Sequence, residues 1–247
     1  MSLLKKLFGK ATTPFDFSSL GVDVHNHFLP SIDDGAQTIA QSIEMLKKME
    51  QLGYRKIVMT PHIYPGLYEN DNDSILTAFK SVVNEQHQFP LLKLNYAAEY
   101  YFEESLFDKI TQKELLTFYG NHVLFEFSFQ NKPNRIDDLI FELNANGYTG
   151  VLAHVERYPY LSGKLEEVQT YRERGILIQL NLSSLSGRYG PGVKKQAEQL
   201  IEHKLVDLVS TDAHRIDHVE LLESIHDSNY LNKLMKLPLK NFDWKSK

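Results

Sequence analysis

Residues 20–27, LGVDVHNH, end a short apolar run with two histidines, and residues 205–214, LVDLVSTDAH, end another apolar run with an aspartate and a histidine. Both runs have the length and composition of buried strands. Each would carry a pair of metal-ligand side chains at its carboxyl end, one pair near the start of the chain and one near its end. We therefore predict a barrel whose first and last strands are neighbours, with a metal centre on its rim. This arrangement is typical of a metal-dependent hydrolase.

The composition is that of an ordinary globular protein, and the length is enough for one large domain or two small ones. The chain has 247 residues, of which 42% are hydrophobic and 24% are charged, and single α/β barrels often have this length. The net charge of −5 argues against a general nucleic-acid-binding protein, which would carry a basic face. The absence of cysteine excludes disulfides, thiolate metal sites and a phosphatase built on a nucleophilic thiolate. We expect a cytoplasmic protein.

The first residues differ in character from the rest. Residues 1–10, MSLLKKLFGK, are basic and only partly apolar. Their apolar stretches are too short for a signal peptide or a membrane span, so we expect no stable membrane insertion. A weak contact with a membrane surface or a partner is the alternative to a frayed terminus. We predict that residues 1–20 form an N-terminal extension and that residues 21–247 form one domain.

Strand-like and helix-like segments alternate along the chain. The strand-like runs are nearly continuous in apolar character, as in parallel strands buried on both faces, and lie near 21–25, 56–60, 92–98, 122–127, 149–154, 176–182 and 206–211. Helical patterns fill the gaps at 38–52, 73–86, 103–118, 135–146, 165–174 and 193–203. Seven such units, without a second zone of composition, predict a parallel α/β fold in one barrel-like domain.

Six of the seven predicted strands end in histidine, aspartate or glutamate. The residues at these ends are His25 and His27, His62, Glu99, Glu126, His154, and Asp212 and His214. Taken singly, each has an ordinary alternative, such as a packing histidine, a cap or a solvated rim carboxylate. One metal site explains them jointly, because the functional groups of α/β barrels gather at the carboxyl ends of the strands. The sixth strand, which ends near Asn181, offers no obvious ligand.

Two further groups of side chains lie close to these strand ends. Asp33 and Asp34 precede Gly35 after the first strand, and we expect only one of the two aspartates to form a turn. Four tyrosines also follow ligand positions closely. They would line a substrate mouth or, equally well, pack the loops of a tyrosine-rich protein; they are Tyr64, Tyr68, Tyr100 and Tyr101.

Several motifs resemble those of a known superfamily. They are HNH at 25–27, DDG at 33–35, TPH at 60–62, HVERY at 154–158 and TDAH at 211–214, together with the strand-end glutamates. This set resembles the PHP superfamily, named for polymerase and histidinol phosphatase domains. The string HNHFLPSIDDG at 25–35 is similar to one branch of it, the manganese-dependent bacterial protein-tyrosine phosphatases of capsule and exopolysaccharide synthesis (the CpsB/YwqE type). The resemblance covers residues 21–215 and implies a distorted seven-stranded TIM-like (β/α) barrel, with 21–247 as a PHP metallophosphatase domain.

The resemblance also implies a site with three divalent metal ions. His25, His27, Glu99 and Asp212 would hold the first ion, Glu99 would bridge to a second ion held by Glu126 and His154, and Asp34, His62 and His214 would hold the third. Manganese is the metal that the family implies, while oxygen and imidazole ligands also suit iron or zinc. Arg157 would contact the substrate phosphate, and Arg215 is a second candidate for that role.

The chemistry of these ligands fits a phosphate ester. Three divalent ions and four carboxylates would leave a surplus of about two positive charges for a phosphate dianion. We therefore predict a metal-dependent protein-tyrosine phosphatase that uses metal-activated hydroxide. Its expected partner is a phosphotyrosine protein, such as a bacterial tyrosine kinase of polysaccharide export, and not a nucleic acid. The alternatives are a PHP-family phosphatase of a small phosphate monoester, such as histidinol phosphate, and a non-catalytic regulator that binds phosphorylated partners.

Overall fold

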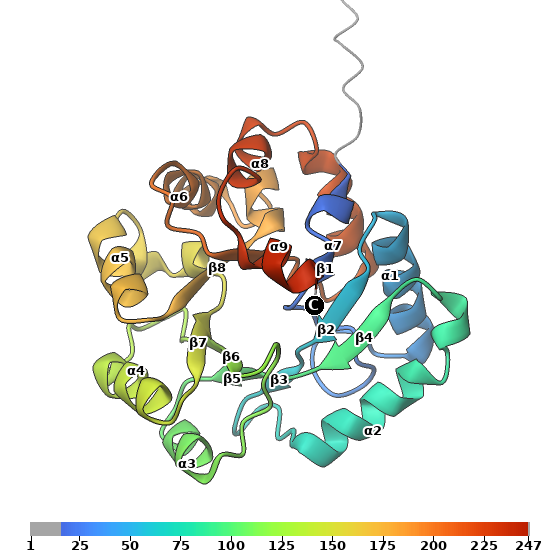
Figure 1. The fold of residues 1–247 in the computed structure, drawn as a ribbon, viewed down its shortest axis with the longest axis horizontal. Coiled ribbons are helices and arrows are strands. Elements are labelled where there is room, and N and C mark those ends of the chain that lie inside the picture. Colours follow the sequence, from blue (N-terminus) through green and yellow to red (C-terminus); the bar gives the residue numbers. More distant parts are fainter. Residues whose placement is uncertain (1–15, 247) are drawn as a thin grey trace, which may run out of the picture.

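The computed structural model describes residues 16–246 and shows a ring of parallel strands with helices around its outside (Figure 1). The predictions for residues 1–10, and most of the predicted N-terminal extension, fall on residues 1–15, which lie outside the described residues. Within the extension, Phe17 and Leu20 are buried, and the Phe17 ring stacks on that of Tyr54 with centroids 5.9 Å apart. Residues 16–20 therefore pack against the domain.

Strands and helices alternate as the sequence predicts. Within residues 16–246 the strands are β1 (Val22–Asp23), β2 (Lys56–Met59), β3 (His62–Ile63), β4 (Lys93–Tyr96), β5 (Glu99–Tyr101), β6 (His122–Glu126), β7 (Thr149–Leu152), β8 (Leu177–Asn181) and β9 (Leu208–Ser210). The α-helices are α1 (Ile39–Gln51), α2 (Asn72–Val83), α3 (Ser105–Gln112), α4 (Ile136–Ala145), α5 (Leu165–Glu173), α6 (Pro191–Glu202), α7 (Ile216–Glu220), α8 (Asn229–Leu234) and α9 (Lys240–Lys245). The predicted α/β barrel class is confirmed.

Two of the seven predicted strands are each broken into two segments. The second run forms β2 and β3, and the third forms β4 and β5, so that hydrogen bonding divides the ring into the sheets β1-β2-β4 and β3-β5-β6-β7-β8-β9. Pro61 lies at the first break and has no N–H for the ladder. The pairing continues across the breaks, because Ala97 donates to the Met59 carbonyl at 2.8 Å and Glu99 donates to the Pro61 carbonyl at 3.0 Å. The breaks distort the barrel immediately before His62 and Glu99.

The first and last strands meet, as predicted from their sequences. Asn26 and Ala213 form a parallel bridge just beyond β1 and β9. The Asp212 N–H donates to the His25 carbonyl at 2.8 Å, and the His27 N–H donates to the Ala213 carbonyl at 3.0 Å. These bonds place the two ligand pairs of the first and last strands side by side at the same end of the barrel.

The opposite end of the barrel, where the strands begin, is closed by α9 (Figure 1). Trp244 is 2% exposed and belongs to an apolar cluster that includes Val22, Val58 and Leu208. On the same helix, the buried Asn241 accepts a hydrogen bond from the Val209 N–H at 3.0 Å and donates to the carbonyls of Val209 and Val22 at 2.8 and 3.2 Å. The C-terminal helix therefore ties the first strand to the last.

The largest difference from the predicted helices concerns α3. The pattern predicts a helix over 103–118, whereas α3 ends at Gln112 and Lys113 adopts a left-handed conformation with φ 62°. Leu115 and Phe118 are buried in the chain that follows, beside the start of β6. The apolar pattern there reflects burial of a non-helical segment. None of the helices within residues 16–246 has the length and apolar character needed to span a membrane.

Candidate metal centre

All nine predicted ligands lie at the end of the barrel where the strands finish. His25, His27 and Asp34 follow β1, His154 follows β7, and Asp212 and His214 follow β9. Glu126 ends β6, whereas His62 and Glu99 are the first residues of the short segments β3 and β5, just past the two breaks. Because the strands are parallel, these side chains gather at one face. They form overlapping groups of three or four donors whose ligating atoms lie within 4.8 Å of one another.

Glu99 lies at the centre of the cluster and is fully buried. Its Oε2 atom is 3.2 Å from His25 Nε2, 3.4 Å from His27 Nε2 and 3.1 Å from His62 Nδ1. Its Oε1 atom is 3.2 Å from His154 Nε2. One carboxylate thus faces four imidazoles, and its two oxygens point toward different groups of them, as a ligand shared between two cations would.

Asp212 and Glu126 extend the cluster on either side of Glu99. Asp212 Oδ1 is 3.4 Å from the Nε2 atoms of both His25 and His27. Glu126 Oε2 is 3.6 Å from His154 Nε2. The residues that the resemblance groups around the first and second ions therefore lie together.

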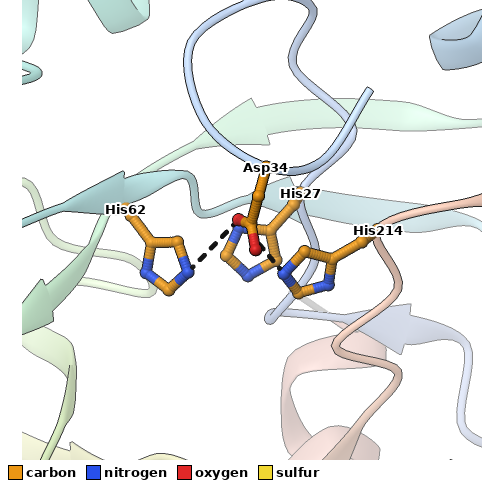
Figure 2. A group of neighbouring side chains, drawn as sticks. All are labelled: His27, Asp34, His62 and His214. Carbon is orange, nitrogen blue, oxygen red and sulfur yellow. Dashed lines mark ion pairs between the residues drawn. The ribbon is translucent and has the colours of Figure 1, made fainter. Parts of the chain in front are cut away.

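A more open group lies at the edge of the cluster, as Figure 2 shows. Asp34 Oδ1 is 3.6 Å from His62 Nε2 and 3.5 Å from His214 Nε2. His27 lies behind this trio, and its ring stacks on that of His214 with centroids 3.9 Å apart. The Asp34 side chain is 52% exposed, so this group borders solvent whereas Glu99 does not.

Unpaired buried atoms show that the cluster fits bound cations. Among the described residues, His25 Nε2, His27 Nε2, His62 Nδ1 and both carboxylate oxygens of Glu99 are buried and make no hydrogen bond. They face one another at ion-pair distances but without hydrogen-bond geometry. Buried polar groups normally have partners, and a metal ion would satisfy several of these lone pairs together. The donor set, imidazole and carboxylate without thiolate, suits a divalent cation.

The electrostatics of the cluster point the same way. Burial, together with the charges of Glu99 and Asp212, raises the pKa of Glu126 well above its usual range. Burial lowers the pKa of His154 to about 4, so this imidazole is neutral near pH 7 and can act as a ligand. Burial opposes ionisation of Asp34, but the hydrogen bond and charge of His214 lower its pKa to about 2. A cation would relieve the repulsion among the carboxylates.

Two residues that are not predicted ligands, Asp33 and Gln179, hold the imidazoles in position. The sequence did not predict this role for either of them. Asp33 forms the turn, because its Oδ1 accepts from the Gly35 N–H at 2.9 Å, and its Oδ2 lies 2.8 Å from His27 Nδ1. The side-chain oxygen of Gln179 in β8 accepts from the backbone N–H of His154 at 2.7 Å and lies 3.1 Å from His25 Nδ1. A partner on Nδ1 leaves the Nε2 lone pair free for a metal. The strand without a ligand therefore supplies an orienting amide.

Asp212 is fixed by two donors on its second oxygen. Asn181 Nδ2 donates to Asp212 Oδ2 at 2.6 Å, and an Arg157 amino group donates to the same atom at 2.9 Å. The Oδ1 atom is left to face the histidines. Both Asp212 and His154 have positive φ, 50° and 35°, a conformation that costs free energy for such residues and is concentrated at functional sites.

A cleft of about 550 Å³ opens above the cluster. Tyr64, Tyr68 and Tyr101 line it, and the rings of Tyr64 and Tyr101 stack with centroids 3.8 Å apart and an interplanar angle of 7°. Tyr100 does not reach the cleft; it is buried, and its hydroxyl accepts from the Leu116 N–H at 2.7 Å. Three of the four tyrosines therefore line the mouth, and the fourth packs a loop.

The two candidate phosphate-binding arginines also line the cleft but differ in their surroundings. The Arg157 side chain is 25% exposed and pairs with Asp212. The Arg215 side chain is 62% exposed and pairs with Asp217 at 3.2 Å. Arg157 is therefore a fixed part of the wall, whereas Arg215 lies on the rim.

The chain is similar to known proteins over most of its length. The family model for capsular polysaccharide synthesis, CpsB/CapC, matches residues 21–225, which include all nine clustered donors and both arginines. The tyrosine-protein phosphatase CpsB of Streptococcus agalactiae is 30% identical over 203 residues, which cover 79% of this chain and 84% of that protein.

Solved structures resemble the fold as a whole. One belongs to the crystal structures of YwqE from Bacillus subtilis and CpsB from Streptococcus pneumoniae, metal-dependent tyrosine phosphatases; it is 27% identical, has a TM-score of 0.73 and covers 89% of this chain and 94% of that one. A histidinol phosphate phosphatase from Lactococcus lactis shares the fold, with a TM-score of 0.56 at 12% identity over 89% of this chain and 94% of that one.

Proposed function

The chain belongs to the CpsB/CapC family of capsular polysaccharide synthesis proteins, and we propose that it acts as a metal-dependent protein-tyrosine phosphatase. The observation that carries this proposal is the convergence of nine histidine, aspartate and glutamate donors beneath one open cleft. The 30% identity with a tyrosine-protein phosphatase supports the substrate class.

We propose that the cluster holds three divalent cations. The donor sets would be His25, His27, Glu99 and Asp212 for the first, Glu99, Glu126 and His154 for the second, and Asp34, His62 and His214 for the third. We propose manganese as the bound metal, and iron or zinc would also suit these donors. When bound, the cations would neutralise charge on the phosphate and lower the pKa of water.

The protein's own side chains would bind and orient the ester. Arg157 would donate to phosphate oxygens from the wall of the cleft, and Arg215 would add a contact from the rim. Since the chain has no cysteine, hydrolysis would not pass through a thiolate nucleophile. The leaving phenol has a pKa of about 10, far below that of an alkyl alcohol, so a buried proton donor is not required.

The walls of the cleft favour an aromatic ester. The stacked pair Tyr64–Tyr101 presents ring surface beside the metal cluster, and Leu67 at the tip of the neighbouring turn is 60% exposed. A phosphotyrosine ring could pack against this surface, while a small polar alcohol would gain little from it. We propose a phosphotyrosine protein of the polysaccharide machinery, such as its tyrosine kinase, as the substrate.

A substrate panel tests this proposal. Metal-free and manganese-loaded protein would be assayed on p-nitrophenyl phosphate, a phosphotyrosine peptide and histidinol phosphate. We expect metal-dependent hydrolysis of the two aryl phosphates and little action on histidinol phosphate. Turnover of histidinol phosphate alone would favour the small-molecule alternative, and absence of metal-dependent turnover on all three would reject the enzyme.

Substitutions at the site would localise the activity. Asp212→Ala and His154→Ala should abolish turnover while the barrel stays folded, as judged by circular dichroism and metal analysis. Arg157→Ala should weaken phosphate binding without emptying the metal sites. Full activity in Asp212→Ala and His154→Ala would refute the assigned cluster.

A further inference from the structure

Arg157 is in contact with two aromatic rings from two different loops. Its guanidinium carbon lies 4.6 Å from the ring centroid of Phe129 and 4.3 Å from that of Tyr189. Phe129 lies in the loop after β6 and Tyr189 in the loop before α6, and both rings line the cleft. We call this pair of rings the aromatic cradle.

The loop that carries Phe129 is anchored to the segment that carries Arg157. The Tyr158 hydroxyl accepts from the Phe127 N–H at 3.0 Å, and the Tyr160 hydroxyl donates to the Ser128 carbonyl at 2.8 Å. The Phe129 ring also stacks on Tyr158 with centroids 5.5 Å apart. The position of Phe129 is therefore set by the residues that directly follow Arg157.

The chain that leads to Tyr189 is anchored to the same segment from the other side. Glu156 is 2% exposed, and its Oε1 atom accepts from the Asn181 N–H at 3.0 Å and from the Ser184 hydroxyl at 2.6 Å. These bonds fix the start of residues 182–190. The short stretch 156–160 thus holds the arginine and both loops of the cradle in one unit.

The Arg157 guanidinium contacts Asp212 on one side and faces the cleft on the other. One amino group donates to Asp212 Oδ2, while the side chain remains 25% exposed toward the cleft. A guanidinium offers five N–H donors in one plane, so donors remain for a phosphate beside Asp212. A long arginine side chain has many rotamers, and rings packed against the guanidinium restrict the plane in which those donors lie.

We propose that Phe129 and Tyr189 are positioning residues that preset the plane of the Arg157 guanidinium for phosphate binding while the same group holds Asp212. The inference rests on the proposed function, because it assigns the cradle to the phosphate subsite of that reaction. The two rings act through Arg157 and do not themselves bind the phosphate.

Phosphate affinity tests the cradle without turnover. Inorganic phosphate would be titrated by calorimetry into manganese-loaded wild type, Phe129→Leu and Tyr189→Leu, with metal content measured in parallel. We expect each leucine variant to bind phosphate about tenfold more weakly, the size of one lost cation–π contact, with unchanged metal content. Tyr189→Phe keeps the ring and should bind as wild type. Phe141→Leu is the matched control, because this ring is 66% exposed on α4, outside the cleft.

A double-variant cycle separates positioning from direct contact. In an Arg157→Lys background, which lacks the planar fork, Tyr189→Leu should have little further effect on phosphate affinity. An equal loss in both backgrounds, or unchanged affinity in both leucine variants, would overturn the inference, as would failure of wild type to bind phosphate. If the protein shows the expected cycle but does not hydrolyse phosphotyrosine, the proposed function is rejected. The positioning role of the aromatic cradle is then still supported.

Discussion

At the end of the barrel where the strands begin, Trp244 fills the interior with an apolar ring, and both polar atoms of Asn241 are hydrogen-bonded. At the end where the strands finish, imidazoles and carboxylates fill the interior, and His25 and Glu99 keep buried atoms without hydrogen bonds. Burying such atoms costs free energy unless a partner is present. The Asn241 side chain therefore has its partners within the protein, whereas the buried atoms of His25 and Glu99 would gain theirs from bound cations.

Both ends also join the first strand to the last, but with different groups. Where the strands begin, Asn241 of α9 bridges Val22 and Val209. Where they finish, the backbone bridge of Asn26 and Ala213 does so, and the buried Asp23 accepts from the Thr211 N–H and hydroxyl, each at 2.9 Å. Hydrogen bonds within the protein therefore connect the first and last strands at both ends, and the unpaired atoms of the candidate metal cluster take no part in this connection.

The largest effect on activity should come from Glu99→Gln, which changes only the end of the barrel where the strands finish and the proposed ligands lie. The amide keeps the shape of the side chain but removes the charge that faces four imidazoles. We expect kcat/KM to fall about a thousandfold or more, because charge stabilisation by the cations is lost, while unfolding of the metal-free protein stays cooperative. Steady-state kinetics, metal analysis and thermal melts would measure this. Glu44→Gln, at an exposed site on α1, is the control; loss of folding in Glu99→Gln would show that the two ends are not independent.

The gathering of the predicted ligands at one end of the barrel could be predicted from the sequence, because most of them are marked by their position next to an apolar run. His62 and Glu99 each directly follow an apolar run, and parallel strands bring such positions to one face. The same logic predicted that the first and last strands are neighbours, which the bridge of Asn26 and Ala213 confirms. The predicted family and enzyme class are confirmed by the CpsB/CapC match and by the relatives.

The supporting residues could not be predicted, because their roles depend on distant partners. Gln179 contacts His25 and is 154 residues away from it in the chain, and an amide gives no signal as a metal ligand. Trp244 lies in a six-residue helix, too short for a clear periodic pattern, and packs against Phe118 and Tyr119. The division of roles between Asp33 and Asp34 likewise depends on where His27 and His214 lie in space.

The second-largest effect, on stability, should come from Trp244→Ala, which changes only the end of the barrel where the strands begin. Trp244 is 2% exposed and stacks on Tyr119 with centroids 5.0 Å apart. We expect a loss of about 3–5 kcal/mol in the free energy of unfolding, as for other large aromatic side chains removed from a core. Turnover by the folded, metal-loaded protein at low temperature should stay close to that of wild type. Denaturant unfolding and kinetics would be measured on the same samples.

Trp244→Phe serves as the control for this substitution, because it keeps an aromatic ring and should lose less stability. Loss of bound metal in Trp244→Ala at temperatures where the protein remains folded would contradict the separation of the two ends. It would mean that α9 sets the register of the strands that carry His25 and Asp212.

The smallest effect should come from Gln179→Met, which leaves every proposed ligand in place and removes only an orienting amide. Gln179 is fully buried, accepts from the backbone N–H of His154 at 2.7 Å and lies 3.1 Å from His25 Nδ1. Loss of such a partner should weaken manganese binding about tenfold. Gln196→Met is the matched control, since Gln196 is also buried and its side chain bonds the backbone of Leu161 and Gly163, away from the cluster. Manganese titrations of both variants would measure this. Equal affinities would mean that Gln179 only packs the barrel. A loss confined to Gln179→Met would mean that β8, the strand without a predicted ligand, also supports the metal cluster.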